Sequence, residues 1–200
     1  MPRAFNDRED KDIRDRLRRE GRRLFSANGV LKTSVESITK IVGIAKGTFY
    51  KFYASKEMLF FELLEDSQNK IRAPLIRDLD SAKPPSRAEL EALLHSMFKA
   101  VCDDPLIQFM GRENELIAIS RKVPPETLIA HQKDDQAFLE TLIARWNTRQ
   151  TPPPRDRIAA RITTFMLVSL NRGFIGDRLV LHAEDAVVAS LADCFFESAP

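Results

Sequence analysis

The chain has 200 residues, a length that fits one medium domain or a small domain joined to a larger one. Hydrophobic residues make up 44% of it, which is enough for a packed core. Its N-terminus is densely charged, and its most apolar run, Ile162 to Leu170, is too short to cross a bilayer. Cys102 and Cys194 lie far apart, without metal or redox spacing. These features argue against secreted and membrane proteins, and we expect a cytoplasmic protein without a metal or a cofactor.

The charge is unevenly distributed, although its net value is only +2. Residues 1–56 contain 14 Lys and Arg against 7 Asp and Glu, whereas the other 144 residues contain 17 against 22. A basic end on an acidic body is expected when only that end contacts phosphate. Solvated helix faces produce the same pattern, so charge alone does not decide between the two.

Apolar residues recur at spacings of three and four, and no strand-like alternation is visible, so the whole chain is predicted to be helical. Caps, glycines and prolines delimit the segments. The nine expected helices cover residues 9–28, 33–42, 45–52, 56–73, 86–101, 105–120, 124–147, 155–174 and 183–197. The predicted fold is all-α, with a three-helix N-terminal head and a helical C-terminal body.

The stretch from Thr33 to Lys56 has the pattern of a helix-turn-helix. Thr33 and Glu36 have the spacing of a capping box, Gly43 supplies the turn, and a second helix of only two turns follows. A helix this short depends on packing, which we assign to Phe49 and Phe52. Gly21, in the middle of the first helix, is expected to allow close approach of a neighbouring helix.

The last two helices are apolar on most of their faces, so each must be buried on most of its faces. We expect a two-fold dimer in which these helices of both subunits form a four-helix bundle. A core within one chain is the alternative. The interface residues assigned on this basis are Ile162, Phe165, Met166, Ser169, Val187, Leu191 and Phe195.

Residues 9–65 resemble the N-terminal signature of the tetracycline-repressor (TetR) family. The resemblance rests on Ile13, Leu24-Phe25, Gly29, Thr33-Ser34-Val35, Ile38, Gly43, Lys46-Gly47-Thr48-Phe49-Tyr50, Phe52 and Ser55-Lys56-Glu57. It implies a homodimeric one-component repressor that releases a palindromic operator when a small molecule binds. Residues 1–55 would be the DNA-binding domain and residues 56–200 the ligand-binding and dimerisation domain. Ala45 and Gly21 depart from the family, which often has Ser and Ala there.

The resemblance also implies which residues contact double-stranded DNA. Hydroxyls and lysines suit phosphates and base edges, and a glycine allows close backbone approach. Thr33 has capping as an equally good role. The expected DNA-contacting residues are Thr33, Ser34, Lys46, Gly47, Thr48, Tyr50, Lys51 and Lys56.

Apolar and aromatic residues of the body are candidates for a cavity that binds an apolar or amphipathic effector. Each of them is also compatible with plain core. The candidates are Met97, Phe98, Phe109, Met110, Arg112, Glu113, Leu116, Phe138, Leu142, Trp146 and Phe165.

No nucleophile elbow, phosphate loop or metal-ligand cluster is visible, so an enzyme is not expected. The alternative function is a dimeric helical ligand-binding or protein-interaction module that does not read an operator. The sequence does not separate a repressor from an activator or from an effector-independent DNA-binding protein.

Overall fold

The computed structural model describes residues 7–79, 85–147, 155–171 and 177–196, the side chains of 79, 145–147 and 177–181 apart. Every element in these ranges is a helix, which confirms the predicted all-α class. The described helices number ten rather than nine. They are α1 (Asp7–Asn28), α2 (Val35–Val42), α3 (Lys46–Phe52), α4 (Lys56–Leu79), α5 (Arg87–Asp103), α6 (Pro105–Phe109), α7 (Glu113–Ser120), α8 (Pro125–Asn147), α9 (Arg155–Leu170) and α11 (Asp177–Phe196).

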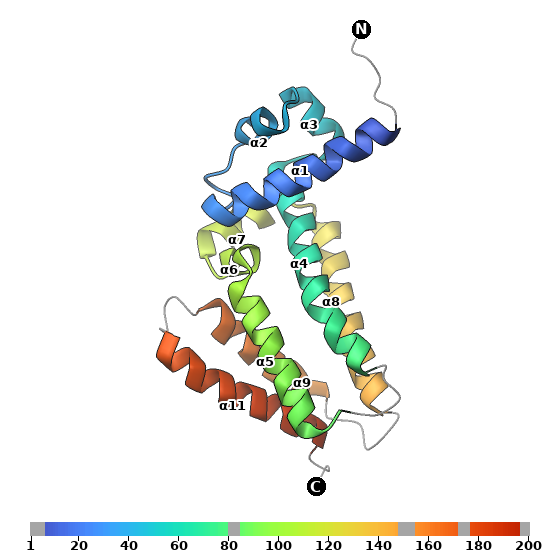
Figure 1. Cartoon of the computed structure of the whole chain (residues 1–200), viewed down its shortest axis with the longest axis vertical. Helices are drawn as coiled ribbons and strands as arrows, with labels where there is room; N and C mark the ends of the chain where they lie inside the picture. Colours follow the sequence, from blue (N-terminus) through green and yellow to red (C-terminus); the bar gives the residue numbers. More distant parts are fainter. Residues whose placement is uncertain (1–6, 80–84, 148–154, 172–176, 197–200) are drawn as a thin grey trace.

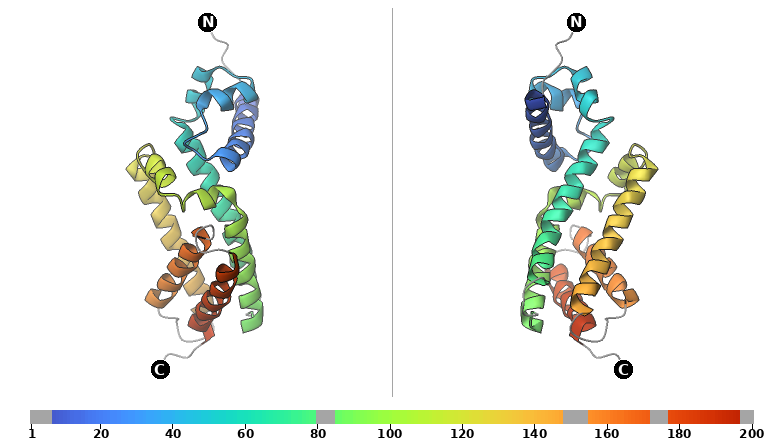
Figure 2. Two further views of the ribbon diagram at one scale, coloured as in Figure 1. Left: turned by 90° about the vertical axis from the view of Figure 1, so that its left-hand side faces the viewer. Right: turned by 90° about the vertical axis from the view of Figure 1, so that its right-hand side faces the viewer.

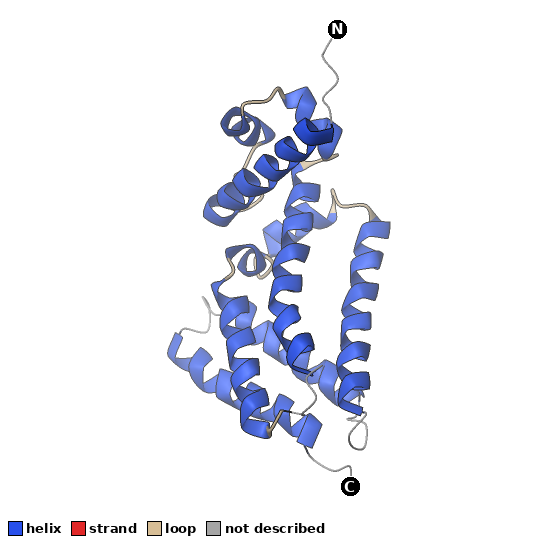
Figure 3. Ribbon diagram, turned by 45° about the vertical axis from the view of Figure 1, so that its right-hand side comes forward, coloured by secondary structure: helices blue, strands red, loops and turns tan. Residues whose placement is uncertain are grey.

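The helices α1, α2 and α3 form a head at one end of the elongated molecule (Figure 1). Helix α4 starts in this head and continues far into the body, where it runs beside α8 (Figures 2 and 3). Helices α5, α9 and α11 pack together at the opposite end. Because α4 belongs to both parts, the position of the head follows the position of α4. Within the described part of the chain, no helix is long and apolar enough to span a membrane.

The core of the head joins α1 to α2, α3 and α4. Phe25 and Phe60 are fully buried and meet edge to face, with ring centroids 5.5 Å apart. A Cβ atom on Gly21 would lie 2.8 Å from Cδ2 of Leu59, which is itself fully buried. The prediction that Gly21 permits a close helix approach is therefore confirmed.

The prediction of a single helix over residues 105–120 is wrong, because the chain turns at residues 110–112 between α6 and α7. The cause is the end of α9, which approaches this turn closely. A Cβ atom on Gly111 would lie 2.5 Å from the carbonyl oxygen of Leu170. Only glycine leaves room for that contact, and its low helix propensity favours a break there.

Helix α4 was expected to kink or stop near Ala73, but it continues past Pro74 to Leu79. A proline in a helix removes one backbone hydrogen bond and disfavours the preceding turn. Here the next residue, Leu75, is buried with Leu90, Ile158 and Leu191 in the core of the body. Tertiary packing thus outweighs the local preference.

The cap expected for α2 is also displaced by one residue. Ser34, not Thr33, is the N-cap, and its hydroxyl accepts from the Ser37 N–H at 3.0 Å in a reciprocal capping box. Thr33 is buried and donates its hydroxyl to the Gly29 carbonyl at 2.7 Å. Glu36 pairs instead with Lys46. Helix α5 begins with a reciprocal capping box formed by Ser86 and Glu89.

Three glycines of the head allow backbone strain and close packing to be separated experimentally. Gly29 has φ +77°, and a Cβ atom there would lie 2.3 Å from Oε1 of Glu115. Gly43 has φ +75°, and a Cβ atom there would lie 3.6 Å from Nη2 of Arg16, which is an ordinary van der Waals contact. A Cβ atom on Gly47 would have no neighbour within 4 Å. In urea unfolding, we expect Gly43→Ala to destabilise by about 1–2 kcal/mol from strain alone. Gly29→Ala should cost about 2–4 kcal/mol because overpacking adds to strain.

The matched control is Gly47→Ala, which should leave the free energy of unfolding within about 1 kcal/mol, on the stabilising side, because Ala is the better helix former. Equal losses for Gly29→Ala and Gly43→Ala would contradict the close packing of Gly29 against α7.

Candidate nucleic-acid interface and ligand cavity

The turn between α2 and α3 is fixed from two directions. Gly43 takes the left-handed conformation, and its N–H donates to the Thr39 carbonyl at 2.9 Å. The guanidinium of Arg16, on α1, donates to the Val42 carbonyl. This bond satisfies a carbonyl that the end of α2 would otherwise leave unpaired. The angle between α2 and α3 is therefore held by α1 as well as by the turn.

Helix α3 has an inward aromatic side and an outward polar side. Phe49 is fully buried, and Tyr53, directly after the helix, is 5% exposed. On the other side Tyr50 is 50% exposed, and Gly47 borders open space. A seven-residue helix with this division is anchored by its aromatic side, and its other side is accessible to a groove.

Lys46 lies on the accessible side of α3 and pairs with Glu36 of α2. The hydrogen bond between them lowers the pKa of Glu36 and raises the pKa of Lys46. Both side chains are more than half exposed, so the pair is weak. A DNA phosphate can therefore replace Glu36 at Lys46.

The other expected DNA-contacting residues differ in accessibility. Ser34 and Lys51 are exposed, and Thr48 is half-buried. Thr33 is buried at 2% exposure and serves the loop rather than the surface. The structure thus brings Lys46, Gly47, Tyr50 and Lys51 together as one exposed face of α3, which we call the α3 face.

Lys56, at the start of α4, is directed at the loop between α1 and α2. Its ammonium donates to the carbonyls of Val30 at 2.6 Å and Thr33 at 2.7 Å, with Leu31 at 3.5 Å. The resemblance assigned Lys56 to phosphate contact. In the structure its charge is engaged in holding residues 29–34, which we call the α1–α2 loop.

Glu115 of α7 holds the same loop from the body. It is only 6% exposed, and its carboxylate accepts from the N–H groups of Val30 at 3.0 Å and Leu31 at 3.1 Å. Hydrogen bonds to a carboxylate are stronger than neutral ones. Glu115 could not be identified from the sequence, because its partner Val30 lies 85 residues earlier and such a distant contact leaves no local pattern.

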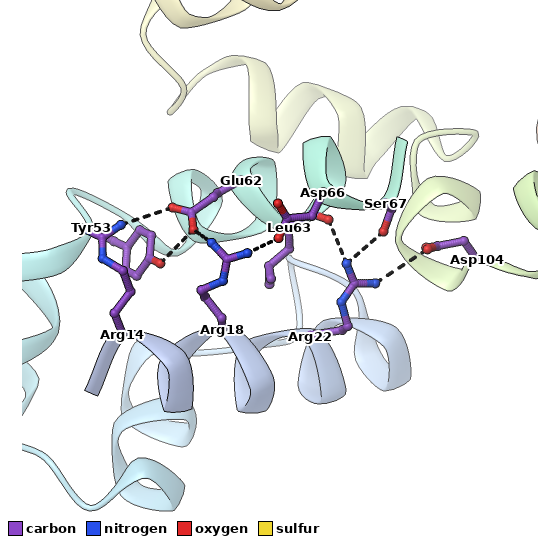
Figure 4. A network of polar contacts seen from close by, with 9 residues as sticks. All are labelled: Arg14, Arg18, Arg22, Tyr53, Glu62, Leu63, Asp66, Ser67 and Asp104. Atoms are coloured by element: carbon purple, nitrogen blue, oxygen red, sulfur yellow. Dashed lines mark hydrogen bonds and ion pairs between the residues drawn. The ribbon is translucent and has the colours of Figure 1, made fainter. Parts of the chain in front are cut away.

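A row of arginines on α1 joins the head to α4 and α6 (Figure 4). Arg18 pairs with Glu62 and Asp66, both on α4. Arg22 donates to the Ser67 hydroxyl at 2.9 Å and lies 3.6 Å from the carboxylate of Asp104. Both arginines therefore face α4 and the start of α6 rather than forming a solvated outer face of the head.

Tyr53 extends this network into the core of the head. Its hydroxyl donates to Oε1 of Glu62 at 3.3 Å, and Arg14 lies 3.6 Å from the same carboxylate. Burial, reinforced by the negative charge of Glu62, raises the pKa of Tyr53 to about 12. The hydroxyl therefore stays protonated and keeps donating over the whole physiological range of pH.

The body contains a cavity of about 380 Å³, within the size range of small-molecule sites. Its walls come from α4, α5, α8, α9 and α11, with Ile107 contributed by α6. Most of the lining is apolar. Arg72 of α4 and Asp135 of α8 are its charged members, and their guanidinium and carboxylate groups lie 2.6 Å apart.

Four of the residues proposed for a ligand pocket line this cavity, namely Met97, Phe138, Leu142 and Phe165. Phe98 and Phe109 are buried in the core, and Met110 packs against it. Arg112, Glu113 and Leu116 are exposed, with Arg112 stacked on Phe109 at 4.3 Å. The side chain of Trp146 lies outside those described.

The residues proposed for a dimer interface lie mainly inside the subunit. Ser169 and Val187 are buried. The other five line the cavity: Ile162, Phe165, Met166, Leu191 and Phe195. When a helix is apolar on nearly every face, its sequence does not reveal which face packs inside the subunit. The sequence therefore could not separate residues of the internal core from residues of a dimer interface.

Comparison with known proteins adds three findings. Residues 17–63, which contain the helix-turn-helix, match the family model of bacterial regulatory proteins, tetR family. A search of curated proteins found no match.

Solved structures share the fold of the whole chain. A TetR transcriptional regulator from Rhodococcus sp. RHA1 is 14% identical, with 94% of this chain and 98% of that chain covered and a TM-score of 0.62. RolR, solved with resorcinol, is 16% identical, with 98% of each chain covered and a TM-score of 0.59. FadR of Thermus thermophilus, a TetR-family transcriptional repressor solved with lauroyl-CoA, is 18% identical, with 94% and 97% covered and a TM-score of 0.52.

The family model thus covers the head, and the fold of regulators from that family extends over the described body. Residues 17–63 are thus similar to the tetR family of bacterial regulatory proteins, and the fold of the chain is similar to that of solved regulators of that family.

Proposed function

We propose that the chain is a cytoplasmic, homodimeric, one-component transcriptional repressor that leaves a palindromic operator when an effector fills the body cavity. The observation that carries this proposal is the α3 face, an accessible set of lysine, glycine and tyrosine on a helix anchored by buried Phe49. Two copies of such a helix, related by a two-fold axis, suit two half-sites about 34 Å apart in the major groove.

An effector would act through contacts that lead from the cavity wall to the head. Ile107 of α6 lines the cavity, and Asp104 caps the same helix through the Leu106 N–H at 2.8 Å. Asp104 also faces Arg22 of α1. A ligand that displaces α6 therefore changes contacts of the head, in addition to any movement of α4.

RolR with resorcinol and Thermus thermophilus FadR with lauroyl-CoA have this fold and bind organic molecules. They support the proposal that the cavity of this chain binds a small organic effector. The largely apolar lining favours a molecule with a mainly apolar body.

For the dimer, we infer that the outward sides of α9 and α11 form the contact, rather than the inward residues assigned from the sequence. Leu167 is 59% exposed, and Ala160, Thr164 and Ala186 are also exposed. The Thr164 hydroxyl donates to the Ala160 carbonyl at 3.0 Å within its own helix. Small side chains with satisfied polar groups allow helices of two subunits to approach closely.

The test of DNA binding is selection of bound fragments from random double-stranded DNA. We expect enrichment of a two-fold symmetric motif, with affinity that falls steeply between about 50 and 200 mM salt as phosphate contacts are screened. Absence of any enriched motif would contradict the proposal and favour a ligand-binding or protein-interaction module.

With the selected fragment, Tyr50→Ala should weaken binding by about 1–3 kcal/mol in a mobility-shift titration. The free energy of unfolding should change little, because Tyr50 is half exposed and its ring meets Phe49 in a T-shaped contact with centroids 5.5 Å apart. Ile129→Ala is the control, since Ile129 is similarly exposed, at 52%, on α8. Unchanged affinity for Tyr50→Ala would count heavily against docking through the α3 face.

For the dimer, Leu167→Asp should shift sedimentation toward the monomer, because it places a carboxylate in the middle of an apolar contact. Ile129→Asp introduces the same group at an equally exposed apolar position of α8 and should leave the dimer intact. A monomeric wild-type chain, or a Leu167→Asp variant as dimeric as the wild type, would refute this interface.

A further inference from the structure

The polar side chains of the cavity gather on one wall. Apart from Thr163, they all come from two neighbouring helices, α4 and α8 (Figure 3). They are Gln68, Arg72, Gln132, Asp135 and Gln136. The walls from α5 and α11 are apolar. A molecule in this cavity therefore has its polar end at the α4–α8 wall and its apolar body toward α5, α9 and α11.

The ion pair on this wall is formed by two unequally buried side chains. Arg72 is 21% exposed, and its guanidinium stacks on the ring of Phe138, 4.8 Å from the centroid. Asp135 is 44% exposed. The imidazole of His131 also lies beside it, with Nε2 at 3.8 Å from Oδ2 of Asp135. Arg72 is thus fixed by packing, whereas Asp135 is fixed mainly by Arg72.

This difference decides which member of the pair a ligand can replace. A cationic ligand that took Asp135 would leave Arg72 without a counterion in the less exposed position, which is unfavourable. An anionic ligand that took Arg72 would release Asp135 toward water and His131. A ligand can therefore replace the Asp135 carboxylate more easily than the Arg72 guanidinium.

We propose that the effector is an organic anion with an apolar body, whose acidic group replaces Asp135 at Arg72. The cavity volume of about 380 Å³ lies in the range of sites for small organic molecules. Planar bidentate recognition by arginine suits a carboxylate in particular. This inference rests on the proposed function and adds the chemical class of the effector. Under this proposal, binding of the effector also breaks the Arg72–Asp135 ion pair, which links α4 to α8.

The test uses three ten-carbon probes that differ only in their polar end: decanoate, 1-decanol and decylamine. Their binding to the full-length protein is measured by calorimetric titration at neutral pH and at concentrations below micelle formation. We expect decanoate to bind more tightly than 1-decanol and decylamine. Tighter binding of decylamine, or equal binding of decanoate and 1-decanol, would overturn the inference.

Two variants give changes of opposite sign. Arg72→Gln keeps a polar side chain with the same first three carbons but removes the charged guanidinium, so it should weaken decanoate binding by about tenfold or more and leave 1-decanol unchanged. Asp135→Asn removes the competing carboxylate, so it should strengthen decanoate binding by about threefold or more. Weaker decanoate binding by Asp135→Asn would refute the exchange even if Arg72→Gln failed to fold.

The same preparations are titrated with the selected DNA fragment without any probe. Failure of all three probes to bind, with DNA binding intact, would overturn this inference and leave the DNA-binding proposal standing. A wild-type protein that did not bind DNA, but bound decanoate more tightly than the other two probes in a way that depended on Arg72, would support the inference about the cavity. The same result would contradict the proposed function.

Discussion

The α1–α2 loop is held by two side chains of opposite charge. One binds backbone carbonyls of the loop and the other binds its backbone N–H groups. Lys56 donates to the carbonyls of Val30 and Thr33, and Glu115 accepts from the N–H groups of Val30 and Leu31. Both partners lie outside the three-helix head, one at the start of α4 and one on α7. The loop leads directly into α2, and α2 leads through Gly43 to α3. The orientation of the α3 face therefore depends on α4 and α7 as much as on the head itself.

The arginines of α1 strengthen the same dependence. Arg18 and Arg22 connect α1 to Glu62, Asp66 and Ser67 along α4. Single exposed pairs of this kind contribute little to stability, but several on one helix face define its register. The domain boundary expected after residue 55 therefore stays a prediction, and these contacts join the helix-turn-helix to α4 across it. Helix α4 joins the α1–α2 loop at one end to the cavity wall at the other.

Local patterns predicted most of the helices and the inward aromatic residues of α3, because caps, glycines and periodic apolar residues act over a few positions. They predicted neither the break at Gly111 nor the continuation past Pro74, since each depends on a distant partner, Leu170 and the core around Leu75. The candidate functional residues divide in the same way. Tyr50 and Lys46 follow from position on a short helix, whereas Glu115, Arg72 and Asp135 gain their roles from contacts between helices. Sequence periodicity also could not show that Ile162 and Leu191 line a cavity rather than a subunit contact.

We expect Glu115, a residue of the body, to set the affinity of the head for DNA. The decisive measurement is the affinity of Glu115→Gln for the selected DNA fragment, with Glu113→Gln, whose side chain is exposed, as the control two residues earlier. Weakening of the two carboxylate hydrogen bonds should loosen the α1–α2 loop and lower the affinity several-fold, although Glu115 belongs to α7 and not to the α3 face. Glu113→Gln should bind as the wild type does. Equal affinity for all three proteins would contradict the claim.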